Sequence, residues 1–121
     1  MLPQAPKTVG SMAGGLDLRP WRTNGWDLKS ILGDPKAHWE NWENASVINW
    51  TETLKPDSPQ IIIDCGADDF FIETNRAVHQ MLAKNHIPHE YTERPGEHNS
   101  EYWSSAIDFQ LLFFEKLFGR Y

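Results

Sequence analysis

The sequence is poor in features that mark several common classes of protein. Its single cysteine, Cys65, excludes an intramolecular disulfide. No apolar run approaches the roughly 18 residues that suggest a membrane-spanning helix, and no charged and then apolar leader opens the chain. The basic residues are scattered and the net charge is −6, so nucleic acid and anionic membranes are poor partners. We therefore expect a soluble protein that binds neither, with no targeting signal in this sequence to specify a compartment.

What the sequence does contain is enough apolar material for one folded unit. At 121 residues, 40% of them apolar, the chain is long enough for one domain and too short for two. We therefore expect residues 1–121 to form a single domain. Six tryptophans are many for this length, and four of them fall within a quarter of the chain, at Trp26, Trp39, Trp42 and Trp50. Such a cluster either lines a binding cleft or packs the core, and the sequence favours neither interpretation.

The pattern of apolar residues predicts alternating strands and helices. A short strand is expected at 8–12 (TVGSM), and a second at 60–64 (QIIID), where β-branched residues run without polar alternation. This second pattern is typical of a strand covered on both faces, as in a parallel sheet flanked by helices. Residues 87–96 (IPHEYTERPG) supply another short strand and a turn. Helical segments are predicted within 26–35, 37–54, 70–85 and 100–118, which makes the fold class α/β.

The last two helical segments each carry an apolar stripe. In the segment 70–85, intervals of four, three and four separate Phe71, Asn75, Val78 and Leu82. In the segment 100–118, one face is marked by Trp103, Ile107, Leu111, Phe114 and Phe118, and beside it lie Phe109, Phe113 and Leu117. So wide an apolar face predicts substantial burial of the terminal helix.

Two loops hold the candidate functional residues. In α/β sheets, chemistry is found at the carboxyl ends of the strands, which here means residues 64–71 (DCGADDFF) and 94–103 (RPGEHNSEYW). The first loop holds Asp64, Asp68 and Asp69. A carboxylate at a helix start also serves simply to cap that helix, and a metal site would need three or more oxygen ligands in a suitable loop, which is not recognisable here. The second loop holds His98, and a lone loop histidine is usually a solvated side chain.

Asp69 and His98 are more informative as a pair than separately. They lie 29 residues apart, with one helix and one strand between them, so both follow successive strands at one edge of the sheet. A carboxylate that accepts a hydrogen bond from one imidazole nitrogen fixes the tautomer, and the other nitrogen then accepts a proton from a serine. In α/β-hydrolases the chain order is nucleophile, acid, histidine, and the acid and the histidine stand in that order here. The pair predicts two members of a catalytic triad.

The stretches IIIDCGADDFF and PGEHNSEYW, followed by an aromatic-rich terminal helix, resemble the C-terminal part of the esterase D-like esterases. That group includes S-formylglutathione hydrolases and feruloyl and acetyl-xylan esterases, and the resemblance runs from about Lys7 to Phe118. It implies the C-terminal part of an α/β-hydrolase fold, with a short, mostly parallel sheet flanked by helices. The family's Gly-x-x-Asp acid pattern falls on Gly66 to Asp69, so Asp69 is the implied acid and Asp68 a near miss. His98 is the implied histidine, and Cys65 resembles a packing residue.

Ser11 is a poor candidate for the nucleophile. The elbow requires Gly-x-Ser-x-Gly between a strand and a helix, whereas Val9 stands two residues before Ser11 and Ala13 two residues after it. The residues that follow are a poor helix, and no other serine has the elbow pattern. The resemblance places Ser11 one strand beyond the nucleophile, where a serine is structural.

The leading hypothesis is therefore the C-terminal part of a serine carboxylic-ester hydrolase that is inactive alone. Its catalytic residues are Asp69 and His98, with no cofactor and no metal, and its substrate is a small-molecule or carbohydrate-linked ester. We expect the chain to associate with itself or to pair with a missing N-terminal half, because half a sheet leaves a strand edge and an apolar face uncovered. One alternative is a truncated, non-catalytic α/β module for oligomerisation or protein interaction. Another is a receiver-type domain that binds a divalent metal through Asp64, Asp68 and Asp69.

Overall fold

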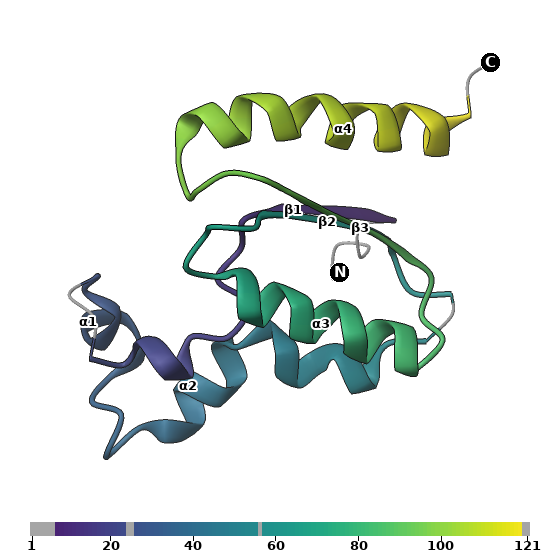
Figure 1. The fold of residues 1–121 in the computed structure, drawn as a ribbon. Coiled ribbons are helices and arrows are strands. Elements are labelled where there is room, and N and C mark those ends of the chain that lie inside the picture. The colour runs from purple at the N-terminus through teal and green to yellow at the C-terminus, as the bar shows by residue number, and fades with distance from the viewer. Residues whose placement is uncertain (1–6, 24–25, 56, 120–121) are drawn as a thin grey trace.

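The computed structural model describes residues 7–23, 26–55 and 57–119. Its centre is a parallel sheet in the order β1-β2-β3, formed by β1 (Thr8–Met12), β2 (Gln60–Gly66) and β3 (His89–Arg94) (Figure 1). Ile63 in the middle strand lies opposite Ser11 on one side and Tyr91 on the other. The three strands lie where the sequence predicted them.

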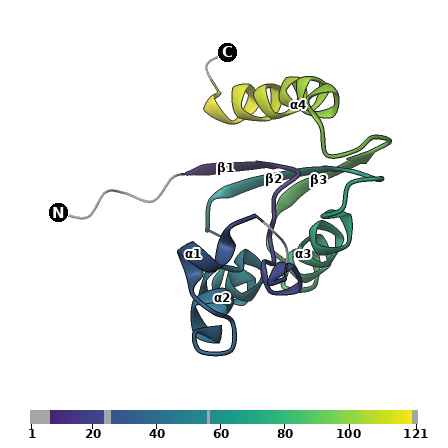
Figure 2. The same ribbon diagram turned by 90° about the vertical axis from the view of Figure 1, so that its left-hand side faces the viewer.

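Helices cover both faces of this sheet. On one face lie α3 (Ile72–Lys84) and the 3₁₀ helix η2 (Val47–Thr53), and on the opposite face lies α4 (Ser100–Phe118) (Figures 1 and 2). Three short elements precede η2, namely η1 (Arg19–Trp21), α1 (Leu28–Leu32) and α2 (Trp39–Ala45). The arrangement is a short parallel sheet between helical layers, which confirms the predicted α/β fold class. No helix in the described part of the chain is long and apolar enough to cross a membrane.

The main core lies between the sheet and α3. Ile63, Val78, Leu82 and Ile87 are each less than 5% exposed and pack together with Leu16. The stripe predicted for α3 is confirmed, because Phe71, Asn75, Val78 and Leu82 are all buried. β2 is buried from Ile62 to Gly66, as expected for a β-branched strand that is covered on both faces.

The predicted face of α4 is wrong. Leu111 and Phe118, which were expected in the core, are 58% and 61% exposed. Of the apolar residues expected in that face, α4 buries only Phe113, together with Tyr102, Ala106 and Gln110. The physical reason is that the sheet presents polar groups to this helix. Gln110 Nε2 donates to the carbonyl oxygen of Ser11 at 3.2 Å, and the Tyr102 hydroxyl donates to the carboxylate of Asp64.

Close approach of α4 to β1 depends on a missing side chain. A Cβ at Gly10 would lie 2.0 Å from Gln110 Oε1 and 2.9 Å from the Phe114 ring. The glycine therefore lets the buried amide of Gln110 reach the strand backbone. A further ring of the predicted α4 face, that of Trp103, is partly buried and packs against a small cluster of Ala13, Cys65 and Ile72.

Candidate active site

The acid of the candidate pair is fixed by the turn between β2 and α3. The Asp69 backbone N–H donates to the carbonyl oxygen of Gly66 at 3.1 Å, and Asp69 Oδ1 accepts the N–H of Phe71 at 2.8 Å. The residue is only 2% exposed. A carboxylate that accepts a free N–H at a helix start is held in one orientation. Asp69 therefore closes an Asx-type turn just before α3, whose N-cap residue is Phe71 with no side-chain cap. The capping role expected from the sequence is not formed, and the turn uses only one of the two carboxylate oxygens.

The second oxygen of Asp69 lies next to His98. His98 Nδ1 is 2.8 Å from Asp69 Oδ2, and the histidine side chain is 26% exposed. Because a carboxylate oxygen accepts, Nδ1 carries the proton, which leaves Nε2 of the neutral ring as an acceptor. No hydrogen bond to Nε2 is formed by the described residues. The arrangement presents an oriented base at the carboxyl edge of the sheet.

The two loops are joined to each other through their backbones. Ala67 N–H donates to the carbonyl oxygen of Arg94 at 2.8 Å, and Asp68 N–H donates to that of Gly96 at 2.9 Å. A Cβ at Gly66 would lie 2.3 Å from the Gly96 carbonyl oxygen. Only glycine therefore permits this approach, and the pairing of β2 with β3 continues into the loops that carry Asp69 and His98.

Aromatic rings surround His98. Its ring centroid is 4.5 Å from that of Phe70, 5.4 Å from that of Phe71 and 5.0 Å from that of Trp103. Trp21 and Trp26 stack on each other at 5.1 Å and pack against Phe70 and Phe71. Phe70 and Trp26 are each nearly half exposed. An aromatic wall formed by Trp21, Trp26, Phe70 and Phe71 thus stands beside the candidate base.

No family model matches the sequence. An acetyl esterase of Caldicellulosiruptor saccharolyticus is 28% identical over 81 residues, which cover 67% of this chain and 28% of that protein. A ferulic acid esterase structure superposes with a TM-score of 0.72 at 24% sequence identity. The match covers 93% of this chain and 43% of the esterase chain. The structure of an acetyl ester-xyloside bifunctional hydrolase of Caldicellulosiruptor lactoaceticus superposes with a TM-score of 0.65 at 19% sequence identity. The match covers 93% of this chain and 43% of that protein. An S-formylglutathione hydrolase of Staphylococcus aureus superposes with a TM-score of 0.59 at 19% sequence identity, and the match covers 88% of this chain and 44% of that protein.

The chain has the fold of part of an α/β-hydrolase and is similar to esterases. It spans less than half the length of these relatives and structural neighbours. The fold and the resemblance predicted from the sequence are confirmed. The catalytic roles of Asp69 and His98 stay predictions, although this fold brings the two side chains together.

The three aspartates of the first loop do not share one pocket. Asp68 is exposed, Asp69 faces His98, and Asp64 is fully buried on the α4 side, where its Oδ2 is 2.9 Å from Arg94 Nη1. Among the described residues, no group of three or more His, Cys, Asp or Glu side chains is placed to hold a metal ion. The acidic pocket of the receiver-type alternative is therefore not assembled in this part of the chain.

Cys65 and Ser11 lie in positions that do not suit a nucleophile. Burial, with the nearby charge of Asp69, raises the pKa of the Cys65 thiol to about 12, so the reactive thiolate is scarce. Ser11 lies inside β1 and is one of the residues that line an apolar pocket with Leu16 and Val78. The chain after β1 is irregular as far as η1, so the strand–elbow–helix arrangement is not formed around Ser11.

The tryptophan cluster divides between both interpretations offered by the sequence. Trp26 belongs to the aromatic wall beside His98, whereas Trp42 is fully buried and its Nε1 donates to the carbonyl oxygen of Gly33 at 3.0 Å. Trp50 Nε1 donates to the Asn44 carbonyl oxygen at 2.8 Å, away from the wall.

Sequence reasoning missed two residues that pack against the loops, Arg94 and Tyr102. The sequence held a general signal but did not identify the partners. A buried carboxylate such as Asp64 requires a cation or several donors. Arg94 pairs with Gly66, which lies two residues after Asp64 in β2. Tyr102 lies just after the predicted start of the terminal helix.

Proposed function

We propose that this chain supplies the acid and the histidine of a serine carboxylic-ester hydrolase. The observation that carries the proposal is the 2.8 Å contact between buried Asp69 and His98 at the carboxyl edge of the sheet. His98 Nε2 takes the hydroxyl proton of a serine as its oxygen attacks the ester carbonyl, and then gives that proton to the leaving alcohol. Asp69 holds the tautomer and stabilises the imidazolium that forms.

Release of the acyl group uses the same two residues. His98 Nε2 takes a proton from water, whose oxygen attacks the acyl-enzyme carbonyl, and the proton returns to the serine oxygen as the carboxylic acid leaves. The serine and the oxyanion-hole donors would come from sequence outside these 121 residues, because no serine here stands in Gly-x-Ser-x-Gly.

The pure 121-residue chain should therefore hydrolyse p-nitrophenyl acetate no faster than buffer does. Hydrolysis that is abolished by His98→Ala would show that the chain is a complete enzyme. Labelling of Ser11 by a fluorophosphonate would contradict the assignment of that residue as structural.

The partner that this proposal requires is an N-terminal α/β-hydrolase segment that bears the nucleophile. Within the described residues no strand pairs with the outer edge of β1. Beside that edge lies a pocket of about 260 Å³, which Val9, Leu16, Val47 and Leu54 help to line. Unpaired strand groups and an open apolar surface favour addition of a further strand.

Co-expression with an N-terminal segment that contains Gly-x-Ser-x-Gly tests this pairing. We expect a one-to-one complex with esterase activity that His98→Ala abolishes. A chain that forms only homodimers and never activates the segment would support the non-catalytic alternative instead.

The non-catalytic alternative rests on the outer face of α4. Leu111, Leu112 and Phe118 are 58%, 47% and 61% exposed, which favours an oligomerisation module. The mass of the pure chain in solution tests it: a strict monomer with a cooperative melt contradicts an oligomerisation role.

The aromatic wall is where we place the substrate. Rings of Trp26 and Phe70 that are nearly half exposed offer flat apolar faces next to the base, and such faces suit a sugar or aromatic ring. A carbohydrate-linked ester fits this surface. Trp26→Ala in the complete enzyme should raise KM for such an ester more than for p-nitrophenyl acetate.

A further inference from the structure

The buried carboxylate of Asp64 joins three elements. Asp64 belongs to β2 and has no exposed surface. Its Oδ2 is 2.9 Å from Nη1 of Arg94 at the end of β3, and its Oδ1 accepts the hydroxyl proton of Tyr102 from the first turns of α4. A buried charge persists only when paired and hydrogen-bonded, so Arg94 and Tyr102 are both held against the end of β2.

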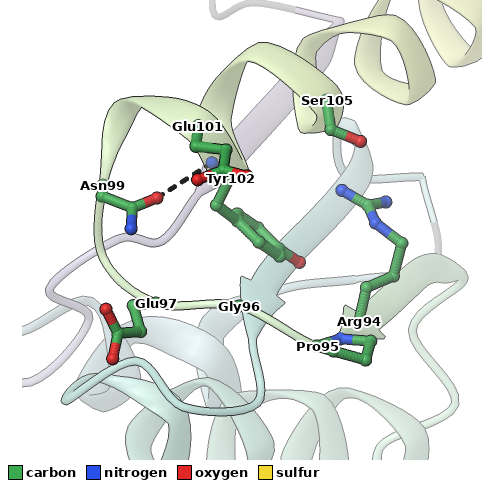
Figure 3. Close-up of a pocket in the computed structure, with 8 residues that line it drawn as sticks. All are labelled: Arg94, Pro95, Gly96, Glu97, Asn99, Glu101, Tyr102 and Ser105. Atoms are coloured by element: carbon green, nitrogen blue, oxygen red, sulfur yellow. Dashed lines mark hydrogen bonds between the residues drawn. The ribbon is translucent and has the colours of Figure 1, made fainter.

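Arg94 is further restrained by ring faces. Its guanidinium carbon lies 5.0 Å from the Tyr102 ring centroid and 4.3 Å from that of Phe109. Both distances are within the range of cation–π attraction. Arg94 and Tyr102 lie next to each other in Figure 3, with Gly96 below Tyr102, and all three line a pocket of about 350 Å³.

Tyr102 is in turn tied to the loop that carries His98. Its backbone N–H donates to Asn99 Oδ1 at 3.0 Å, the dashed line in Figure 3. Gly96 has φ +144°, and a Cβ there would lie 2.5 Å from Tyr102 Cδ2. The Tyr102 ring thus rests on the turn before His98, while its backbone fixes the residue after it.

These contacts bracket His98 from both sides. Arg94 and Gly96 precede it, Asn99 and Tyr102 follow it, and the restraints converge on one buried carboxylate. None of them touches the His98 ring or Asp69 by hydrogen bond, so Asp64 acts through the loop and not in the chemistry.

We propose that Asp64 is a positioning residue, which holds the His98 loop through Tyr102 and Arg94 so that the His98 ring meets Asp69. The inference rests on the proposed function of the Asp69–His98 pair. The inference gives a role to Asp64, a buried aspartate that is not a member of the proposed triad. Without this tie, the loop has fewer restraints and the ring samples orientations in which Nδ1 no longer faces Asp69 Oδ2.

The test is the tautomer of His98, read from the imidazole nitrogen resonances of the 121-residue chain at a pH where the ring is neutral. The wild type should show the proton on Nδ1. Tyr102→Phe removes only the hydroxyl that donates to Asp64. It should shift His98 toward the Nε2–H tautomer that free histidine favours, with the Nδ1 proton signal lost, while far-ultraviolet circular dichroism stays unchanged.

Tyr91→Phe is the matched control, because the Tyr91 hydroxyl also donates to a carboxylate, Glu93, at 2.7 Å on the same sheet. It should leave the His98 tautomer as in the wild type. If Tyr102→Phe fails to fold, Asp64→Asn takes its place, since it keeps the side-chain shape, removes the charge that pairs with Arg94, and should produce the same tautomer shift.

The outcomes separate this inference from the proposed function. A wild-type chain whose His98 lacks the Nδ1 proton overturns both, because the Asp69–His98 pair is then not formed. If Asp69→Asn changes the tautomer but Tyr102→Phe and Asp64→Asn do not, the pair stands and the positioning role of Asp64 is overturned. An equal shift in Tyr91→Phe overturns it as well.

Discussion

Asp69 divides its two oxygens between local structure and the candidate chemistry. Oδ1 accepts the Phe71 N–H and Oδ2 lies against His98 Nδ1. The turn and the candidate catalytic role are therefore compatible, since a single carboxylate serves both. The turn bond to the Phe71 N–H holds the carboxylate in one orientation toward His98, which is a form of preorganisation.

At this scale, Asp69→Asn should leave the fold intact and impair only the chemistry. An amide at this position removes the acceptor that holds the Nδ1–H tautomer, and the corresponding change in other triads lowers kcat by about 10⁴-fold. The measurement is kcat for p-nitrophenyl acetate in the complex with a nucleophile-bearing segment. Asp68→Asn, at the exposed neighbouring residue, is the control and should stay within twofold of the wild type. A large loss in Asp68→Asn would move the acid to Asp68.

Among the elements, α3 and α4 differ in how fully the sequence describes them. α3 packs on β-branched and aliphatic side chains of the sheet, so its apolar stripe is also its buried stripe. α4 packs on polar groups and glycine, so it buries a hydroxyl and an amide and exposes leucines. The spacing of apolar residues therefore identified the buried face of α3 but not that of α4.

Matched leucine truncations test this difference. Leu82→Ala in α3 should lower the free energy of unfolding by about 2–5 kcal/mol, because it opens a cavity in the main core. Leu111→Ala in α4 should change it by less than about 0.5 kcal/mol, because that side chain is 58% exposed. Urea unfolding followed by tryptophan fluorescence measures both. An equal loss for Leu111→Ala would mean that the outer face of α4 is covered in solution.

The whole molecule has a second titratable cluster, on the α3 side of β3. His79 Nδ1 lies 2.7 Å from His89 Nε2, and the His79 ring stacks on Tyr91 at 4.2 Å. His89 Nδ1 donates to the Ile87 carbonyl oxygen at 2.9 Å, so His89 Nε2 accepts from His79 when both rings are neutral. Burial, with the neighbouring His89, lowers the pKa of His79 below its usual 6.5.

This depression makes the stability of the molecule depend on pH. Because the folded state binds the His79 proton less tightly than the unfolded state, the contribution of this group is fully present above pH 6.5. It is lost as the pH falls below that value toward the lower pKa of the folded state. Urea midpoints should therefore fall between pH 7 and 5.5.

His79→Gln should flatten this pH dependence, whereas His38→Gln, at an exposed histidine, should retain it. A slope that survives His79→Gln unchanged would assign it to another group. The ion pair of Arg76 and Glu93 lowers the Glu93 pKa from 4.5 to about 2. It therefore makes stability depend on pH only below about pH 4.5, outside the range of this experiment.

The strands, the long helices, the α3 stripe and the two loops that carry Asp69 and His98 could be predicted from the amino-acid sequence, because they depend on local periodicity and on where parallel strands end. Tertiary structure alone decided the buried face of α4, the division of the tryptophans between core and site, and the partners of Asp64. The α4 face and the partners of Asp64 depend on polar groups that meet across 30 to 99 residues of chain, and the place of Trp26 depends on its packing against the distant Phe70. A hydrogen bond between distant segments leaves no period in the sequence, so neither the Tyr102–Asp64 contact nor the Gln110–Ser11 contact was predictable. The Asp69–His98 pair was predictable because two adjacent parallel strands deliver both residues to the same edge.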